Sequence, residues 1–143
     1  MSNYFKMSEA GSIALHAMIM LSDNPNRLVR IREIADTFKV SEAHLAKVLN
    51  RLAKSGLVIA KRGPSGGYKL NKPAKEISLK EIYETIEGKL EENRCLFGIS
   101  VCEGTGCTIG DFFTKTSQQV EEKLSKTKLS DIKLKADFET TGL

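Results

Sequence analysis

Apolar residues recur every three or four positions in the first third of the chain, which is the spacing of helices that bury one face. The first such stretch, 8–21, begins at Ser8, a residue type that caps helix N-termini. A shorter stretch follows at 31–38, after a polar break. The expected buried stripes are Ile13, Ala14, Ala17, Met18 and Leu21 in the first helix, and Ile31, Ile34, Ala35 and Phe38 in the second.

A third helix is predicted directly afterwards, over 42–55. Lys39 and Val40 form a tight connection, Ser41 is the expected N-cap, and Gly56 stands where a helix end favours a left-handed residue. Its predicted buried face consists of Leu45, Val48, Leu49 and Leu52. Its outward face is predicted to carry His44, Lys47 and Arg51, which are three and four residues apart.

A β-hairpin is predicted next, because two short extended runs flank a turn. The runs are 57–62 and 68–70, and Pro73 ends the unit. The turn is built from Gly63, Pro64, Ser65, Gly66 and Gly67.

The second half of the chain predicts two more helices. Ser78 and Glu81 have the spacing of a capping box, and Gly88 closes that helix. A longer helix is expected over 108–127, with Thr108 as its cap. Its apolar seam consists of Ile109, Phe112, Phe113, Val120 and Leu124. Left open, this seam would be a large exposed patch, so a second copy of the chain, the first helix of the same chain, or both are expected to cover it.

Charge divides the chain into unlike parts. Residues 1–80 hold 14 Lys and Arg against 6 Asp and Glu, whereas residues 81–143 hold 8 against 12. The first part therefore carries a net charge of +8 and the second −4, which suggests a polyanionic partner for the first part. No apolar run approaches a membrane span and no signal peptide is visible, so we expect a cytoplasmic protein without a membrane partner.

Two short helices joined by a tight turn and followed by a hairpin make a winged helix-turn-helix, a fold that binds duplex DNA. The third helix would enter the major groove, and the cations before the hairpin glycines would reach the minor groove or the backbone. Amphipathic helices in proteins that bind no DNA have the same pattern, but the basic bias and the glycine-tipped hairpin favour binding. The predicted DNA-contacting residues are Ser41, Glu42, His44, Lys47, Arg51, Lys61, Arg62, Gly63, Ser65, Gly66 and Gly67.

All three cysteines lie in the stretch "RCLFGISVCEGTGC", at Cys95, Cys102 and Cys107. Six residues separate the first pair and four the second, and glycines between them let the sulfurs turn inward. Thiolates are soft ligands that favour iron–sulfur clusters, zinc and copper(I), and three of them leave one ligand position open. Metal-free thiols that sense oxidants and a structural zinc site remain alternatives.

The stretches "LVIAKRGPSGGYKL" and "ISLKEIYETIEG" resemble the wing and following helix of the Rrf2 family of bacterial winged-helix transcription regulators (IscR/NsrR-like). The "SxxGxxALHAM" pattern from Ser8 to Met18 is similar to the first helix of that family, and the resemblance runs over about residues 7–134. It implies a homodimer that binds a palindromic operator. It also implies an iron–sulfur cluster on three cysteines between the last two helices, where Cys95, Cys102 and Cys107 fall.

The resemblance also points to the first helix for the fourth ligand. Glu9, Ser12 and His16 are three and four residues apart and share a face. In family members that complete the cluster from this helix, the ligand can come from the partner subunit. His16 is the first candidate, because the "ALH" at 14–16 is similar to a member in which the histidine is a ligand; Glu9 or Ser12 is the alternative.

These observations predict a mainly α protein, a winged helix-turn-helix with a long C-terminal dimerisation helix. We divide it into a DNA-binding domain (1–88), a cluster loop (89–107), a dimerisation region (108–134) and a disordered tail (135–143). The expected function is a dimeric transcriptional regulator, a repressor, that senses redox state, nitric oxide or iron through a 2Fe-2S or 4Fe-4S cluster. An enzyme is disfavoured, because no nucleophile–histidine pair, phosphate loop or acidic pair stands out, and no small-molecule substrate is expected.

Overall fold

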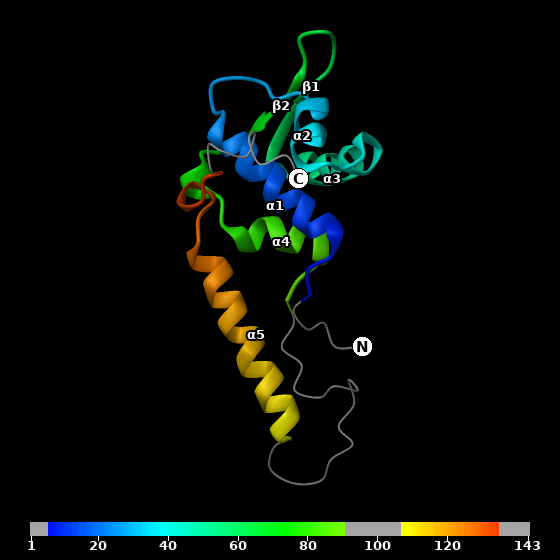
Figure 1. The fold of residues 1–143 in the computed structure, drawn as a ribbon. Coiled ribbons are helices and arrows are strands. Elements are labelled where there is room, and N and C mark those ends of the chain that lie inside the picture. Colours follow the sequence, from blue (N-terminus) through cyan, green and yellow to red (C-terminus); the bar gives the residue numbers. More distant parts are fainter. Residues whose placement is uncertain (1–5, 91–106, 135–143) are drawn as a thin grey trace.

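The computed structural model describes residues 6–90 and 107–134, and Figure 1 shows the arrangement of their elements. Three helices, α1 (Glu9–Asp23), α2 (Ile31–Phe38) and α3 (Glu42–Lys54), are followed by strands β1 (Val58–Lys61) and β2 (Gly67–Leu70). A 3-10 turn, η1 (Ala74–Glu76), leads to α4 (Leu79–Glu87), and α5 (Thr108–Lys126) is followed by a second 3-10 turn, η2 (Leu129–Asp131). The predicted fold class, a mainly helical winged helix-turn-helix with a long C-terminal helix, is confirmed.

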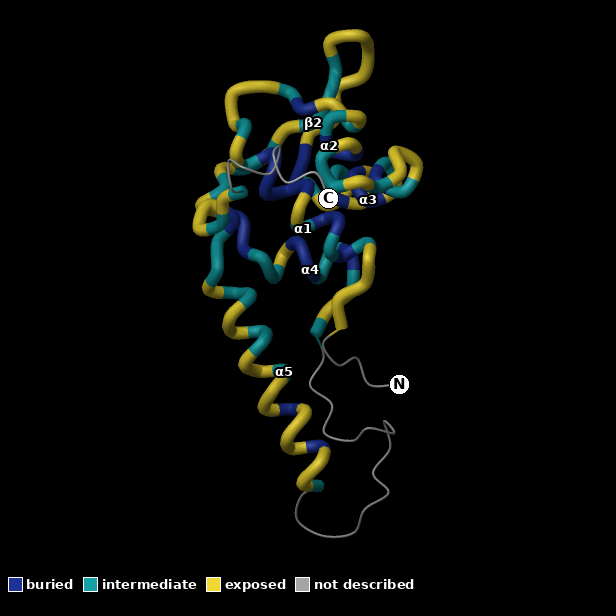
Figure 2. Tube along the Cα trace, viewed as in Figure 1, coloured by how far each residue is buried: buried dark blue, intermediate teal, exposed yellow. Residues whose placement is uncertain are grey.

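Helix α1 is the centre of the core. It contacts α2, α3, α4, β2 and η2, and Figure 2 shows buried residues along it. Every residue of its predicted stripe is buried, and so is the predicted inner face of α3. Burial on several sides explains why α1 is apolar beyond a single stripe: Ile19 and Met20 are buried as well. In the described ranges, no helix has both the length and the apolar character needed to cross a lipid bilayer.

The helix boundaries follow the local signals in the sequence. The Ser8 hydroxyl accepts a hydrogen bond from the Gly11 amide, and Ser41 accepts one from the His44 amide, both at 3.1 Å. Both halves of the Ser78–Glu81 capping box are present. These contacts satisfy amides that the first turn of each helix leaves unpaired.

The hairpin has the predicted location, although its first strand is shorter and Gly67 belongs to the second. Strands β1 and β2 are antiparallel, with Val58 opposite Leu70 and Lys61 opposite Gly67. One pairing was not predicted: Val29 and Tyr68 exchange two backbone hydrogen bonds of 2.8 Å each. The segment before α2 therefore supports β2, which lies between Val29 and β1.

Helix α5 is attached to the rest of the molecule at its C-terminal end. The Leu129 amide donates to the Ile77 carbonyl at 2.8 Å, and the Leu79 amide donates to the Thr127 carbonyl at 3.0 Å. The Lys80 ammonium bonds the Glu121 carboxylate at 2.8 Å, which joins α4 to α5. In Figure 1 the N-terminal half of α5 extends away from the other helices. Within the chain α5 packs chiefly against α4, and not against the first helix as one prediction had it.

The predicted cap of α5 was wrong by one residue. Helix α5 begins at Thr108, and its N-cap is Cys107, whose sulfur accepts a hydrogen bond of 3.4 Å from the Gly110 amide. Thr108 has a typical capping side chain, but the preceding cysteine has the extended backbone that an N-cap needs.

Candidate nucleic-acid interface and cysteine site

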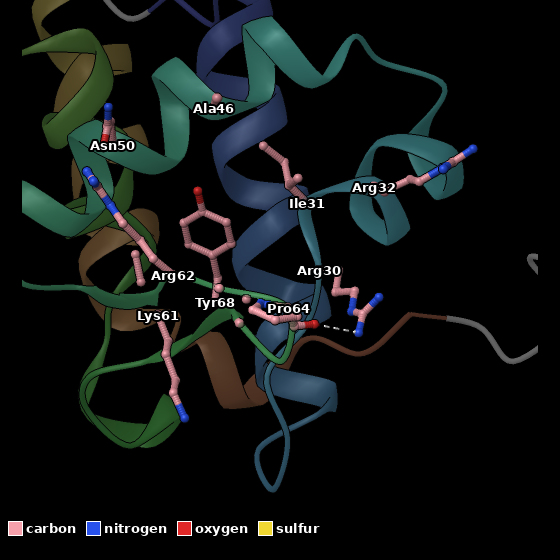
Figure 3. Close-up of a pocket in the computed structure, with 13 residues that line it drawn as sticks. Arg30, Ile31, Arg32, Ala46, Asn50, Lys61, Arg62, Pro64 and Tyr68 are labelled. Carbon is pink, nitrogen blue, oxygen red and sulfur yellow. Dashed lines mark hydrogen bonds between the residues drawn. The ribbon is translucent and has the colours of Figure 1, made fainter.

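A cavity of about 710 Å³ lies between α3 and the wing (Figure 3). Four cations line it, and none of its lining residues is acidic. We call it the basic cavity. Its lining residues are Arg30, Ile31, Arg32, Ala46, Asn50, Ala60, Lys61, Arg62, Gly63, Pro64, Gly66, Gly67 and Tyr68.

The lining side chains point in different directions. Figure 3 shows Arg62 reaching from the wing toward Asn50 on α3, and Tyr68 directing its hydroxyl toward the side of α3 that carries Ala46. Lys61 extends away from α3 in that view, and Arg32 points outward from the start of α2. Of the two adjacent wing cations, Arg62 therefore faces the helix, and Lys61 faces away from it.

Contacts with the segment before α2 set the angle of the wing. The Arg30 guanidinium donates to the Pro64 carbonyl at 3.0 Å and holds the wing turn. A Cβ at Gly67 would lie 2.7 Å from the Val29 carbonyl oxygen, and one at Gly66 would lie 2.1 Å from the Lys61 carbonyl oxygen. Larger residues at these two positions would thus collide with the protein's own backbone, which is a structural reason for glycine besides the approach of DNA.

The predicted DNA-contacting residues do not form one group. Five wing residues, Lys61, Arg62, Gly63, Gly66 and Gly67, line the basic cavity, and Ser65 lies between them in the turn without lining it. On α3, Ser41, Glu42 and Lys47 are exposed but do not line the cavity, and His44 is half-buried. Arg51 is exposed at the surface, but its guanidinium donates to the carbonyls of Thr85 and Ile86 at 3.1 and 2.7 Å.

Several lining residues were not predicted from the sequence, among them Arg30, Arg32, Ala46, Asn50 and Tyr68. A stricter use of the helical period would have found Asn50, whereas Ala46 lies at the border of the exposed face. The buried positions 45, 48, 49 and 52 imply an exposed face through 43, 47, 50 and 54, so that 44 and 51 lie at its border. No sequence signal identifies Arg30, because its role depends on the return of the wing 34 residues later.

The cysteine site is described only in part, because Cys95 and Cys102 lie outside the described residues. Cys107 is half-buried, has a free thiol, and receives the hydrogen bond from Gly110 at the start of α5. Among the side chains that the structure describes, no three His, Cys, Asp or Glu come together as metal ligands would. The predicted tail, 135–143, also lies outside the described residues.

The candidate fourth ligands lie on α1. His16 is exposed, and its Nδ1 lies 2.7 Å from the carbonyl oxygen of Ser12. A carbonyl oxygen only accepts hydrogen bonds, so Nδ1 is the donor in this contact, which leaves Nε2 as the ring nitrogen that could bind a metal. Glu9 is exposed and Ser12 half-buried. In Figure 1 the N-terminal end of α5, which Cys107 caps, lies well apart from α1, the helix that carries His16.

Comparison with known proteins places these features in context. A family model named Rrf2 and described as an iron-dependent transcriptional regulator matches residues 7–134. The HTH-type transcriptional regulator IscR of Cereibacter sphaeroides is 33% identical over 135 residues, which cover 89% of this chain and 86% of that protein.

Two solved structures are similar over most of their length. CymR, described as the global cysteine regulator of B. subtilis, is 27% identical with a TM-score of 0.76, covering 89% of this chain and 95% of that one. The oxidized form of Staphylococcus aureus CymR is 25% identical with a TM-score of 0.73, covering 88% of this chain and 94% of that one.

Proposed function

The chain belongs to the Rrf2 family of DNA-binding transcriptional regulators and is not an enzyme, and from this premise we propose that its three cysteines make it a sensor. The proposed protein is a homodimer that binds a palindromic operator through α3 and the wing and represses transcription. Its signal is redox state, nitric oxide or iron, sensed through an iron–sulfur cluster. The basic cavity between α3 and the wing is the observation that carries the DNA-binding part.

The basic cavity is suited to a DNA backbone and groove. Four cations line it with no lining carboxylate to oppose them, and cations that neutralise phosphates release counterions. Asn50 offers the amide that pairs with adenine in a major groove, and Ala46 offers a methyl group that can contact thymine. Arg62 is proposed to enter the minor groove beside the site that α3 reads.

Replacing Arg62 with alanine is expected to weaken binding to duplex DNA about tenfold, because a guanidinium in or beside a groove contributes about 1–3 kcal/mol. The salt dependence should also become shallower, by about one unit of slope, if the group meets a phosphate. Fluorescence anisotropy with a duplex enriched by the wild-type protein from a random pool measures both. Lys123→Ala, an exposed cation on α5, is the matched control and should bind as wild type. Equal binding by the two variants would refute the role of Arg62.

A second copy of the chain is the proposed cover for the apolar seam of α5. Ile109, Phe112 and Phe113 are 57%, 65% and 38% exposed, which is unusual for large apolar side chains three and four residues apart. Lys80 of α4 contacts Glu121 in the second half of α5, whereas Ile109 and Phe112 in the first half remain exposed, so we propose that a partner covers this end of the seam. Two copies joined through this helix would present two reading heads to a two-fold symmetric site.

The sensing part of the proposal depends on the thiols. Cys107 fits a ligand role, because a half-buried sulfur that already accepts a backbone N–H resembles a thiolate in a metal site. His16 fits as a fourth ligand through Nε2, since ligating histidines usually donate their other N–H to a carbonyl, as Nδ1 does to Ser12 here. Because α1 and the start of α5 lie apart in one chain, His16 of the partner subunit is the ligand we favour. A bound iron–sulfur cluster would supply a reversible, oxidant-sensitive link between these residues.

We propose that the state of the cysteines changes the spacing of the two reading heads. The cysteine-containing segment connects α4, in the DNA-binding unit, to α5, the proposed dimer helix. A change in that segment would therefore alter the angle between α4 and α5. A small change in spacing is enough to alter affinity for two half-sites at a fixed separation. The cytoplasmic location predicted from the sequence is kept as part of this proposal.

Two alternatives keep DNA binding and change the sensor. Metal-free thiol sensing has some support, because a relative of this chain, S. aureus CymR, has a structure described as an oxidized form. A structural zinc site with three cysteines and a histidine is the other alternative.

Purification without oxygen separates these cases. We expect a brown protein whose visible absorbance is lost in air or nitric oxide. A colourless protein whose DNA affinity changes with peroxide and recovers with dithiothreitol would favour thiol sensing instead. A colourless protein that contains zinc and ignores oxidants would favour the structural site.

A further inference from the structure

Arg51 joins the recognition helix to the end of α4. It lies on α3, yet its Nη2 donates to two backbone carbonyls of α4, those of Thr85 at 3.1 Å and Ile86 at 2.7 Å. These belong to the last turn of α4, whose carbonyls lack partners within the helix. A cation there also meets the negative end of the helix dipole. The contact is therefore charge-assisted and spans 34 and 35 residues of sequence.

The last turn of α4, residues 83–87, is a junction of several elements, which we call the α4 end. The Ser8 amide, at the N-cap of α1, donates to the Glu87 carboxylate at 3.2 Å, and the Ser8 hydroxyl bonds the same oxygen. The Tyr83 hydroxyl donates to the Lys6 carbonyl at 2.7 Å. A Cβ at Gly11 would lie 2.7 Å from the same Glu87 carboxylate, so α1 and α4 approach closely here.

The α4 end lies just before the cysteine-containing stretch in the sequence. Helix α4 closes at Gly88, and the chain reaches Cys95 seven residues later. The recognition helix is thus hydrogen-bonded, through one side chain, to the turn from which the chain enters its cysteine-containing stretch.

We propose that Arg51 is a positioning residue that couples the orientation of α3 to the α4 end, rather than a contact for DNA phosphate. The proposal deepens the sensor function and rests on it for the identity of the signal. Arg51 lies at the border of the exposed face of α3, on the side of α4, and its guanidinium is already engaged there. A change at the cysteine-containing stretch that moves the α4 end would consequently tilt α3.

The test compares Arg51→Met with Lys47→Met, an exposed cation one turn earlier on the same helix. For each variant, binding is measured to the duplex that wild-type protein enriches from a random pool and to a random duplex of equal length, over a range of salt. A positioning role predicts that Arg51→Met loses about tenfold in affinity for the enriched duplex. Its binding to the random duplex and its salt slope should be unchanged. Lys47→Met should weaken binding to both duplexes alike, and it should lower the slope of log affinity against log salt concentration by about one.

Hydrogen exchange supplies a readout that needs no DNA. The Gly88 amide donates to the Glu84 carbonyl at 3.0 Å, within the turn that Arg51 holds. In Arg51→Met this amide and its neighbours in the α4 end should exchange faster, whereas Lys47→Met should leave them as in the wild type. If Arg51→Met lost affinity equally for both duplexes and its affinity depended less steeply on salt, the proposal would be overturned in favour of a phosphate contact. Unchanged affinity for the enriched duplex would overturn it as well.

A further arm tests the coupling itself. Cys102→Ala is added to the wild type and to Arg51→Met, and the affinity for the enriched duplex is measured anaerobically. The change caused by Cys102→Ala should be several-fold smaller in the Arg51→Met background, since coupled sites are not additive. Equal changes in both backgrounds would overturn the coupling. If the wild type itself does not respond to Cys102→Ala, the proposed sensor function fails, while the salt and exchange measurements still decide whether Arg51 positions α3.

Discussion

Replacing Cys107 with serine is expected to abolish the visible absorbance of anaerobically purified protein and the response of its DNA affinity to oxidants. A hydroxyl is a hard and weak ligand compared with a thiolate, so a three-cysteine site loses an essential donor. Helix α5 should be unharmed, because serine is among the best N-cap residues and its oxygen can accept from the Gly110 amide in place of the sulfur. Absorbance spectra, iron content and circular dichroism measure these effects together.

Two further variants separate the loss of a ligand at Cys107 from the loss of the helix cap. Cys107→Ala removes the ligand and the cap at once, so it should bleach the protein and fray the first turn of α5 by about 1 kcal/mol. Cys102→Ala should bleach it without touching that cap. If Cys107→Ser kept its colour, its iron and its full response, Cys107 would not be a ligand and the metal-sensing proposal would fail.

Replacing Phe112 with aspartate is expected to convert the protein into a monomer with little loss of folding stability. The side chain is 65% exposed within one chain, so the carboxylate costs little there, whereas it would be buried against a second copy. A monomer loses the advantage of two linked reading heads, so affinity for a palindromic duplex should fall by about 100-fold or more. Sedimentation velocity reports the oligomeric state, and anisotropy reports the affinity.

Lys115→Asp is the matched control for this prediction. It is an exposed residue of the same helix, it changes the charge by more, and it is not part of the apolar seam. It should remain dimeric and bind DNA nearly as the wild type does. A Phe112→Asp protein that sediments as a dimer would show that another surface joins the copies.

Much of the fold follows from short-range signals. Ser8, Ser41 and the Ser78–Glu81 box begin their helices as predicted, because an N-cap interacts with amides two or three residues away. Gly56 adopts the left-handed conformation that was expected at the end of α3, with φ 83°. The predicted N-cap that failed, at Thr108, failed because the preceding residue, Cys107, has the extended backbone that an N-cap needs.

The candidate site was less predictable, for a reason that Arg51 and Asn50 illustrate. Helical periodicity identifies the residues that share a face, but it does not say which neighbour contacts that face. Arg51 was grouped with Lys47 as a DNA contact, yet its guanidinium bonds carbonyls of α4. Asn50 was not considered, yet it lines the basic cavity beside the wing.

By itself, then, the sequence determined the order and limits of the helices, the wing, the basic character of the first unit and the membership of the chain in its family. All of these depend on residues close together in the chain or on motifs read directly. Only the tertiary structure decided that Val29 pairs with Tyr68, that Arg30 holds the wing, that Arg51 bonds the end of α4, and that Ile109 and Phe112 of α5 stay exposed. Each of these depends on packing between segments that are distant in sequence, and no local pattern encodes the distance or angle at which such segments meet.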